Sequence, residues 1–388
     1  MASNRITPNW LHVARDFQVN QELVWLNSCG IAPMPTPVLS AVKAHLDAYA
    51  RKVIFGPRSD EELRSAISSH LAARIGALPH EVAPIHHTTE GMTFISLGLN
   101  LSAGDGVVLM ANEYPSNVYP WQHLQSQGVT FQTLADGPTP EDVIASASQL
   151  LDERTRVLAV SAVHWCTGMP LPLQALGRLC KERGVLFVVD GAQGVGHVPI
   201  DVNACNIGAM AFSAWKWLMG PIGLGAFYVR QDLLAELKFP FKGTGSVVND
   251  HVYFPYRDDL KPNTARYVVS TPSFTDWAHF EASLSYLDTL GVENVRNRVH
   301  ALALHLGQQL KQQGFELARD GFATHPTAIV AARAPGRDMA RLVADLGTLG
   351  IVAAERLGWM RMAPHIHLNE DQLDTVATTA GRLLRAQS

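Results

Sequence analysis

Cysteine is scarce in this chain of 388 residues. Its four cysteines include no CxxC pair, which excludes a disulfide scaffold and the common zinc ribbons. Lysine and arginine number 31 against 35 acidic residues, a balance that excludes a generally basic nucleic-acid binder. No apolar run approaches the roughly 20 residues of a membrane helix, and the opening MASNRITPNW lacks the pattern of a secretion signal. We therefore expect a soluble, cytoplasmic protein of enzyme size.

Apolar sequence, by contrast, is abundant, since 47% of the residues are hydrophobic. In the middle of the chain, short apolar runs alternate with amphipathic stretches such as 172–184, which ends in glycine and predicts a helix. Strands that alternate with helices indicate a largely parallel sheet with helices on both faces. The runs that predict buried strands are 105–111, 156–163, 184–190, 208–213 and 223–229.

The sequence pattern changes near residue 275, where long helical patterns replace the short apolar runs. We expect residues 21–274 to form a large domain and residues 275–388 a smaller α+β domain. Residues 1–20 are expected to pack on the small domain or on a partner subunit.

Lys216 lies in an apolar segment, AFSAWKWLMGP, between two tryptophans. Burial of an ammonium group without a partner is costly, so a lysine in such surroundings tends to lose its proton. The neutral amine is the form that Schiff-base chemistry requires. A lone lysine can also lay its stem against the tryptophans and keep its amine in water. The assignment therefore depends on its neighbours.

Asp190 ends the most apolar predicted strand, VLFVVD, and Lys216 follows 26 residues later at the end of another. Alone, Asp190 is better explained as a capping or loop carboxylate. Together, the two strand ends match the needs of pyridoxal phosphate, which takes a carboxylate at its pyridinium nitrogen and a lysine at its aldehyde. Gln193 is a candidate donor to the ring hydroxyl of this cofactor.

The segment HHTTEGMTF places Thr88 and Thr89 at the start of a helical pattern. Backbone N–H groups and hydroxyls at such a position form a phosphate cradle, although an ordinary capping box explains the same residues. Ser213 and Thr271 are further hydroxyls that can reach the same phosphate.

Two aromatic residues near predicted strand ends have open assignments. Tyr114 either stacks on a planar cofactor ring or is a core or rim residue. Trp215 either donates its indole N–H to the phosphate or simply packs. Other signals are weaker: no GxGxxG fingerprint opens the first βα unit, and no metal site is predicted around the histidines. Those histidines, interpreted as structural or pocket-lining, are His164, His197, His365 and His367.

The segments DGAQGVGHVPIDV and FSAWKWLMGPIGLGAFYV resemble the cofactor core of class V aminotransferase-family enzymes. The resemblance extends from LNSCGIAPMP (26–35) through RMAPHIHLNEDQLD (361–374). It implies the aspartate aminotransferase-like fold (fold type I) of pyridoxal-phosphate enzymes, an α/β fold with a smaller α+β C-terminal domain. It also implies a homodimer with active sites at the subunit interface. The family includes cysteine desulfurases, selenocysteine lyases, kynureninases and isopenicillin N epimerase-like proteins.

The resemblance also implies roles for residues at matching positions. Lys216 forms the aldimine with the cofactor, Asp190 holds the pyridine nitrogen, and Arg361 matches the arginine that binds the substrate α-carboxylate. The remaining implied contacts are Gln193 to the ring oxygen, Tyr114 to the ring face, Thr88, Thr89, Ser213 and the partner subunit's Thr271 to phosphate, and Asn27 and Gly30 to the substrate.

The chain departs from the desulfurase pattern at three places. Desulfurases carry a cysteine on a loop shortly before the carboxylate-binding arginine, whereas AAERLGWMRM contains none. Trp215 replaces the usual histidine before the lysine, and Trp165 makes the pocket more aromatic. The missing cysteine argues against a persulfide-forming desulfurase, unless Cys29 or Cys166 takes that role.

We therefore predict a pyridoxal-phosphate-dependent enzyme that acts on an α-amino acid or amine. The predicted type is an aminotransferase or a β-eliminating C–S or C–Se lyase, because the core residues serve both. The alternatives are an epimerase or racemase of the isopenicillin N epimerase-like group, a cysteine desulfurase, and a non-catalytic cofactor-binding scaffold.

Overall fold

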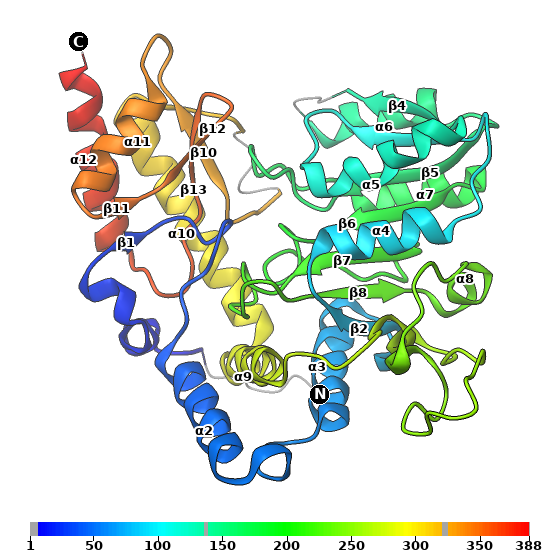
Figure 1. Ribbon diagram of the computed structural model, residues 1–388. Coiled ribbons are helices and arrows are strands. Elements are labelled where there is room, and N and C mark those ends of the chain that lie inside the picture. Colours follow the sequence, from blue (N-terminus) through cyan, green and yellow to red (C-terminus); the bar gives the residue numbers. More distant parts are fainter. Residues whose placement is uncertain (1–6, 136–138, 320–324, 388) are drawn as a thin grey trace.

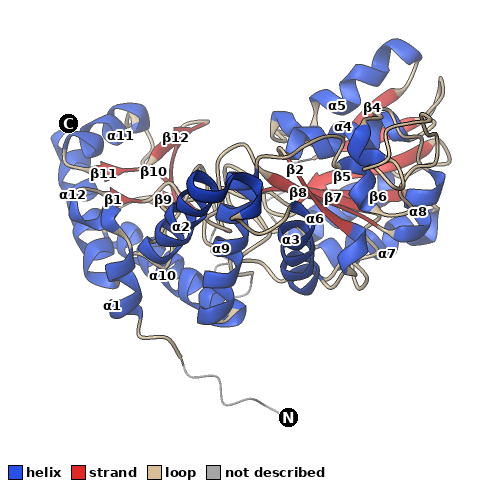
Figure 2. Cartoon of the chain, turned by 60° about the horizontal axis from the view of Figure 1, so that its bottom comes forward, coloured by secondary structure: helices blue, strands red, loops and turns tan. Residues whose placement is uncertain are grey.

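The computed structural model of the protein describes residues 7–135, 139–319 and 325–387, so residues 1–6 of the predicted N-terminal segment lie outside it. The chain forms two lobes, a larger one around a mostly parallel sheet and a smaller one that contains the C-terminus (Figures 1 and 2). Within the described ranges, no helix combines the length and the apolar character needed to cross a membrane.

A seven-stranded sheet forms the centre of the large lobe, in the order β2-β8-β7-β6-β5-β3-β4. Neighbouring strands are parallel except where β8 is involved. All five strands predicted from apolar runs are present, and the predicted α/β fold is confirmed. The strands are β2 (Val82–Ile85), β3 (Gly106–Met110), β4 (Thr130–Leu134), β5 (Thr155–Ser161), β6 (Leu186–Asp190), β7 (Ala209–Ser213) and β8 (Gly225–Val229).

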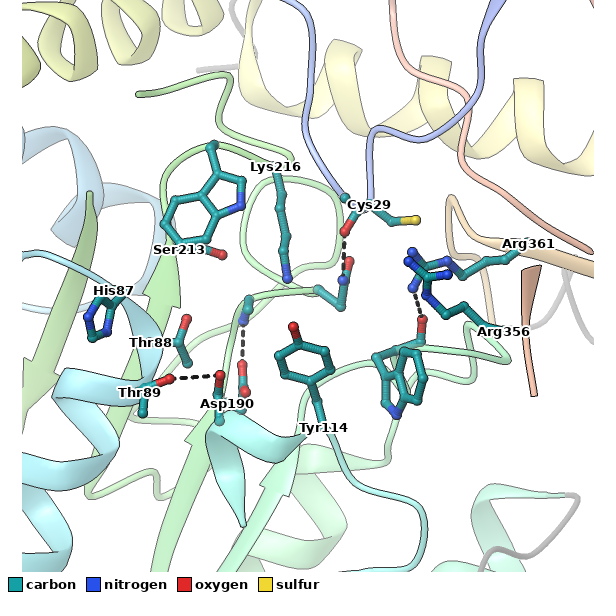
Figure 3. Close-up of a pocket in the computed structure, with 16 residues that line it drawn as sticks. Cys29, His87, Thr88, Thr89, Tyr114, Asp190, Ser213, Lys216, Arg356 and Arg361 are labelled. Carbon is teal, nitrogen blue, oxygen red and sulfur yellow. Dashed lines mark hydrogen bonds between the residues drawn. The ribbon is translucent and has the colours of Figure 1, made fainter. Parts of the chain in front are cut away.

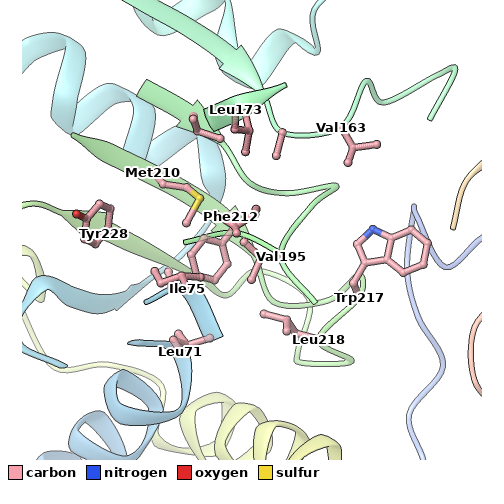
Figure 4. Packing of buried hydrophobic residues seen from close by; sticks show 14 of the residues in the cluster. Leu71, Ile75, Val163, Leu173, Val195, Met210, Phe212, Trp217, Leu218 and Tyr228 are labelled. Carbon is pink, nitrogen blue, oxygen red and sulfur yellow. The ribbon is translucent and has the colours of Figure 1, made fainter. Parts of the chain in front are cut away.

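Helices cover both faces of this sheet because alternate residues of each buried strand point to opposite sides. On one face, Phe94 and Trp121 belong to a core that includes Phe227. On the other face, Phe212 and Tyr228 pack with Leu71 and Ile75 (Figure 4). The helices are α4 (Thr88–Gly98) and α5 (Tyr119–Gln122) on the first face, and α3 (Asp60–Ile75), α6 (Pro140–Leu150) and α7 (Leu173–Arg183) on the second.

The small lobe contains an antiparallel sheet in the order β12-β13-β10-β9 and its own core. Its strands are β9 (Glu316–Leu317), β10 (Val330–Arg333), β12 (Ala354–Arg356) and β13 (Trp359–Met362). The helices of its core are α10 (Val292–Gln312), α11 (Met339–Thr348) and α12 (Glu370–Ala386). Three further helices, α2 (Thr36–Lys52), α8 (Gln231–Glu236) and α9 (Phe274–Leu290), complete the described fold together with α1 (Trp10–Val13).

The N-terminal segment joins the small lobe. β1 (Val24–Trp25) pairs in parallel with β11 (Ile351–Val352), and Leu26 enters the small-lobe core. Residues 24–26, assigned to the large domain from the sequence, therefore belong to the small lobe, because backbone pairing with β11 holds them there. The other predicted domain limits remain predictions.

Candidate active site

A pocket of about 370 Å³ lies where the ends of β5, β6 and β7, the start of α4 and the small lobe meet (Figure 3). This is the carboxyl edge of the parallel strands, where open α/β sheets bind ligands. Ten of the twelve predicted site residues line it: Gly30, Thr88, Thr89, Tyr114, Asp190, Gln193, Ser213, Trp215, Lys216 and Arg361.

Asp190 and Lys216 form the buried charged centre of the pocket. Asp190 is 2% exposed and accepts a hydrogen bond from the Ala192 N–H at 2.8 Å. Burial raises the pKa of the Asp190 carboxyl above its ordinary value. Burial also lowers the pKa of the Lys216 ammonium, although the charge of Asp190 opposes this. Burial in this pocket therefore acts toward the neutral amine of Lys216, the form that Schiff-base chemistry requires.

The side-chain amide of Gln193 is held from two sides. Its Nε2 donates to the Cys29 carbonyl at 2.8 Å, and its Oε1 accepts from Trp217 Nε1 at 3.1 Å. These two bonds fix which end of the amide is the donor, and one N–H of Nε2 remains for a ligand. Trp217, a fully buried neighbour of Lys216, was not singled out from the sequence.

The start of α4 forms the hydroxyl-rich end of the pocket. His87 caps the helix, because its Nδ1 accepts from the Glu90 N–H at 3.1 Å. Thr89 Oγ1 donates to Ser116 Oγ at 2.9 Å, while the buried Ser213 Oγ has no hydrogen-bond partner among the described residues. Helix N–H groups, hydroxyls and one unsatisfied buried hydroxyl together suit a phosphate group.

Aromatic rings and arginines form the opposite end. Tyr114 is 42% exposed, and its ring packs edge-on against the Trp165 ring with 5.6 Å between the two ring centroids. Lys216 Nζ lies 5.5 Å from the centroid of the Tyr114 ring. Arg361 is only 4% exposed and donates through Nη1 to the Trp165 carbonyl at 2.7 Å. Its Nε is buried without a hydrogen-bond partner in the described part of the chain, which leaves donors for an anion.

Two predicted residues do not line this pocket. Asn27 lies behind Gly30, where its side chain accepts a weak hydrogen bond from the Cys29 thiol at 3.7 Å. Its predicted contact with the substrate stays a prediction. Thr271 is exposed in two other surface pockets of the same chain. Its predicted role in the site of a neighbouring subunit stays a prediction.

Sequence reasoning missed several lining residues. His87 and Ser116 belong to the same polar segments as Thr89 and Tyr114, so their position after strand ends was an available signal. Arg356 also lines the pocket. It lies in AAERLGWMRM, a segment interpreted from the sequence only for its lack of a cysteine. No group of three or more His, Cys, Asp or Glu side chains in the described ranges is arranged to hold a metal ion.

These residues fit pyridoxal phosphate. A buried carboxylate such as Asp190 requires a cationic partner, which a pyridinium nitrogen supplies. Lys216 provides the amine for the aldehyde, Gln193 a donor for the ring oxygen, and Ser213 an unsatisfied hydroxyl for the phosphate. The pocket therefore offers a matching group for each functional part of this cofactor.

The comparisons with known proteins agree with this geometry. The sequence model of the aminotransferase class-V family matches residues 24–352. A cysteine desulfurase of Cronobacter sakazakii is 30% identical over 303 residues, which cover 75% of this chain and 73% of the relative. The apo cysteine desulfurase of Thermococcus onnurineus has a TM-score of 0.86 at 22% identity and covers 100% of both chains.

A third similar protein is the cystine C–S lyase C-DES in complex with its reaction product, cysteine persulfide. Its TM-score is 0.84 at 21% identity, with 92% of this chain and 97% of that chain covered. Another structure of C-DES holds glycine covalently linked to its pyridoxal-phosphate cofactor. The match to the family model over most of its length shows that this chain belongs to the aminotransferase class-V family of pyridoxal-phosphate-dependent enzymes.

Proposed function

We propose that the protein is a lyase that cleaves the Cβ–S bond of a sulfur-containing α-amino acid. One observation carries this proposal: the pocket combines Lys216 and Arg361 with a single thiol, Cys29, which is buried. The names of the similar proteins above, cysteine desulfurases and a cystine C–S lyase, describe cleavage of the same kind of bond. The proposal therefore retains C–S cleavage without a protein thiol as sulfur acceptor.

The proposed cofactor contacts follow the pocket geometry. Asp190 holds the pyridine nitrogen, and Gln193 donates to the ring oxygen. Thr88, Thr89 and Ser213 bind the phosphate. Trp215 packs at the same end of the pocket, and Tyr114 covers the ring. When bound, the cofactor withdraws electrons from the substrate α-carbon, which makes its proton acidic.

Lys216 and Arg361 carry out the protein's part of the reaction. Arg361 binds the α-carboxylate and so orients the bond from Cα to hydrogen. The neutral Lys216 amine takes the α-proton. The electron pair of that bond then forms the Cα–Cβ double bond as the Cβ–S bond breaks, and Lys216 returns the proton to the departing sulfur. Hydrolysis of the carbon skeleton gives a 2-oxo acid and ammonia.

Neither Cys29 nor Cys166 is suited to accept sulfur. Burial raises the pKa of the Cys29 thiol, even though Arg361, Lys216 and Arg356 lower it, and the thiolate is the nucleophilic form. Cys166 does not line the pocket, and its Sγ donates to the Arg356 carbonyl at 3.3 Å. A desulfurase mechanism therefore lacks a ready nucleophile here.

Product analysis with a single substrate tests the proposal. The cofactor-loaded protein is given L-cysteine or an S-alkyl-L-cysteine with no 2-oxo acid present. We expect 2-oxo acid, ammonia and thiol or sulfide in equal amounts over many turnovers. One equivalent of 2-oxo acid per subunit without ammonia would identify an aminotransferase. Loss of optical activity without these products would identify an epimerase. Either of these two outcomes contradicts the proposal.

The Cys29→Ala variant separates a lyase from a desulfurase. Because the proposed mechanism does not use the thiol, thiol or sulfide release should stay within about threefold of wild type, less than 1 kcal/mol in the barrier. Cys205→Ala, which removes a thiol outside the pocket, is the matched control. A loss of a hundredfold or more in Cys29→Ala alone would make Cys29 a sulfur acceptor.

A further inference from the structure

The substrate end of the pocket is lined by two guanidinium groups from one hairpin. Arg356 ends β12, and Arg361 lies in β13. The antiparallel pairing places Ala354 opposite Arg361 and Arg356 opposite Trp359. Figure 3 shows both arginine side chains extending into the pocket from the same side.

No carboxylate in the described ranges forms an ion pair with either guanidinium group. Arg361 donates to the Trp165 carbonyl and Arg356 to the Glu355 carbonyl, and both acceptors are backbone oxygens. The acid nearest in sequence, Glu355, is occupied by the turn, because its Oε1 accepts from the Gly358 N–H at 2.6 Å. Neither positive charge is therefore neutralised by an acidic side chain of the described part of the chain.

The guanidinium groups of Arg356 and Arg361 face the same part of the pocket. Arg361 and Arg356 each lower the pKa of the Cys29 thiol, which lies in the pocket wall (Figure 3). The phosphate cradle at Thr88 and Thr89 is at the opposite end, so the cofactor phosphate does not neutralise them. A single arginine can bind the one α-carboxylate of an amino acid through two parallel N–H···O hydrogen bonds. The second guanidinium group exceeds what a simple amino acid needs.

The backbone of Arg356 is held in place. Leu357 and Gly358 form the tight turn between β12 and β13, with φ of 54° and 81°. The Cys166 thiol donates to the Arg356 carbonyl at 3.3 Å and ties the strand to the loop after β5. Arg356 thus extends from a fixed backbone position, although its own side chain is exposed to solvent.

We propose that Arg356 binds a second anionic group of the substrate, carried by the sulfur-bound part that departs. The proposal rests on the proposed C–S lyase function and names its substrate class: an α-amino acid in which the β-sulfur carries a carboxylate or similar anion. Arg361 then binds the α-carboxylate while Arg356 binds the distal anion, one guanidinium group for each charge.

A matched pair of substrates tests this assignment. S-carboxymethyl-L-cysteine and S-ethyl-L-cysteine differ in that a carboxylate replaces a methyl group beyond the sulfur. We expect the wild-type protein to show a KM at least tenfold lower for the carboxymethyl compound, a factor equal to 1.4 kcal/mol. Arg356→Gln should remove this preference by raising only that KM, with kcat within about twofold. Arg356→Lys should restore part of it. Arg341→Gln, an exposed arginine of α11 paired with Asp345, is the control.

Binding without turnover distinguishes failure of this inference from failure of the proposed function. By calorimetry on the cofactor-loaded protein, glutarate should bind at least tenfold more tightly than butyrate, and Arg356→Gln should equalise the two. If neither cysteine derivative is cleaved but glutarate keeps this advantage, the lyase proposal fails and the second anion site stands. If Arg356→Gln weakens butyrate and glutarate equally, both arginines serve one carboxylate and the inference is wrong. If it changes neither, Arg356 binds no ligand and the inference is also wrong.

Discussion

At the residue scale, Glu113 connects the pocket to the sheet beneath it. Its carboxylate accepts from the Ser161 N–H at 2.7 Å, from Ser161 Oγ at 2.5 Å and from the Tyr114 N–H at 2.8 Å. Ser161 pairs with Asp190 across β5 and β6. Glu113 therefore fixes the backbone of Tyr114 and lies close to the acid that we assign to the pyridine nitrogen.

The proton on Glu113 makes stability depend on pH. Burial, and secondarily the charge of Asp190, raises the pKa of Glu113 to about 7 from an ordinary value of 4.5. Between these values the folded cofactor-free protein keeps a proton that the unfolded chain releases. The free energy of unfolding should therefore fall as pH rises through this window and level off above it.

Glu113→Gln removes this contribution. From pH 5 to pH 8, the free energy of unfolding should shift in favour of the variant relative to wild type by roughly 2–3 kcal/mol. Urea unfolding at several pH values measures this shift. Glu182→Gln, an exposed acid on α7, controls for the lost charge. A difference between Glu113→Gln and wild type that does not change with pH would contradict the account.

The sequence predicts the residues whose neighbours are informative and misses those defined by three-dimensional contacts. Lys216 stands out because apolar residues flank it, and Asp190 because it ends an apolar strand. In the sequence, Glu113 is indistinguishable from an ordinary loop acid. Its hydrogen bond with Ser161, which is 48 positions away, exists only in the folded chain. Arg356 is unremarkable in sequence, and only the hairpin turn places it beside Arg361.

At the element scale, α4 depends on Gly91 for its close contact with the sheet. A Cβ at this position would lie 2.5 Å from the Ala211 Cβ in β7 and 3.0 Å from Ile85 Cδ1. The helix therefore packs directly on the strands, which sets its first turn, with Thr88 and Thr89, at the pocket. This contact positions the proposed phosphate site.

Gly91→Ala should push α4 away from the sheet. We expect a loss of about 1–3 kcal/mol in the free energy of unfolding, as for other overpacked sites. Cofactor affinity should also fall several-fold, because the helix start moves. Gly347→Ala in α11 is the matched control, since an added Cβ there meets nothing within 4 Å. The control should be neutral or slightly stabilising. Equal behaviour of the two variants would refute the packing argument.

The large-lobe strands that the sequence predicts are those with continuous apolar runs. β6 and β7 are continuous apolar runs, which is the pattern of central parallel strands. β2 contains Pro84, and β4 is a largely exposed edge strand of mixed polarity, so neither has a strong strand pattern. Edge strands form through pairing with a neighbour, and that information is not local.

At the scale of the whole molecule, the pocket exists only because distant segments meet. Cys29 and Gly30 come from the N-terminal segment, Lys216 from the large lobe and Arg361 from the small lobe. The hydrogen bond from Arg361 to the Trp165 carbonyl spans 196 positions of the sequence. The family resemblance predicted this convergence, but no local pattern in the chain could.

The predicted homodimer makes a testable claim about Thr271, which is exposed away from the pocket of its own chain. We expect the purified protein to be a dimer in which the partner subunit's Thr271 binds the cofactor phosphate. Thr271→Val should weaken cofactor binding about tenfold, equal to 1.4 kcal/mol. Dimers that combine a Thr271→Val chain with a Lys216→Ala chain should regain one site of wild-type affinity. If the mixed dimers regain none, Thr271 does not act across the interface.

The central claim is that Lys216, which follows β7 and lines the same pocket as Asp190, is the lysine that holds the cofactor. Borohydride reduces the C=N bond between the lysine and the cofactor to a stable amine. Mass spectrometry of the digested protein then identifies the modified lysine. We predict that one of the eight lysines of the chain, Lys216, carries the added mass, and that Lys216→Ala carries none. Modification of another lysine, or an unchanged result in Lys216→Ala, would contradict the account.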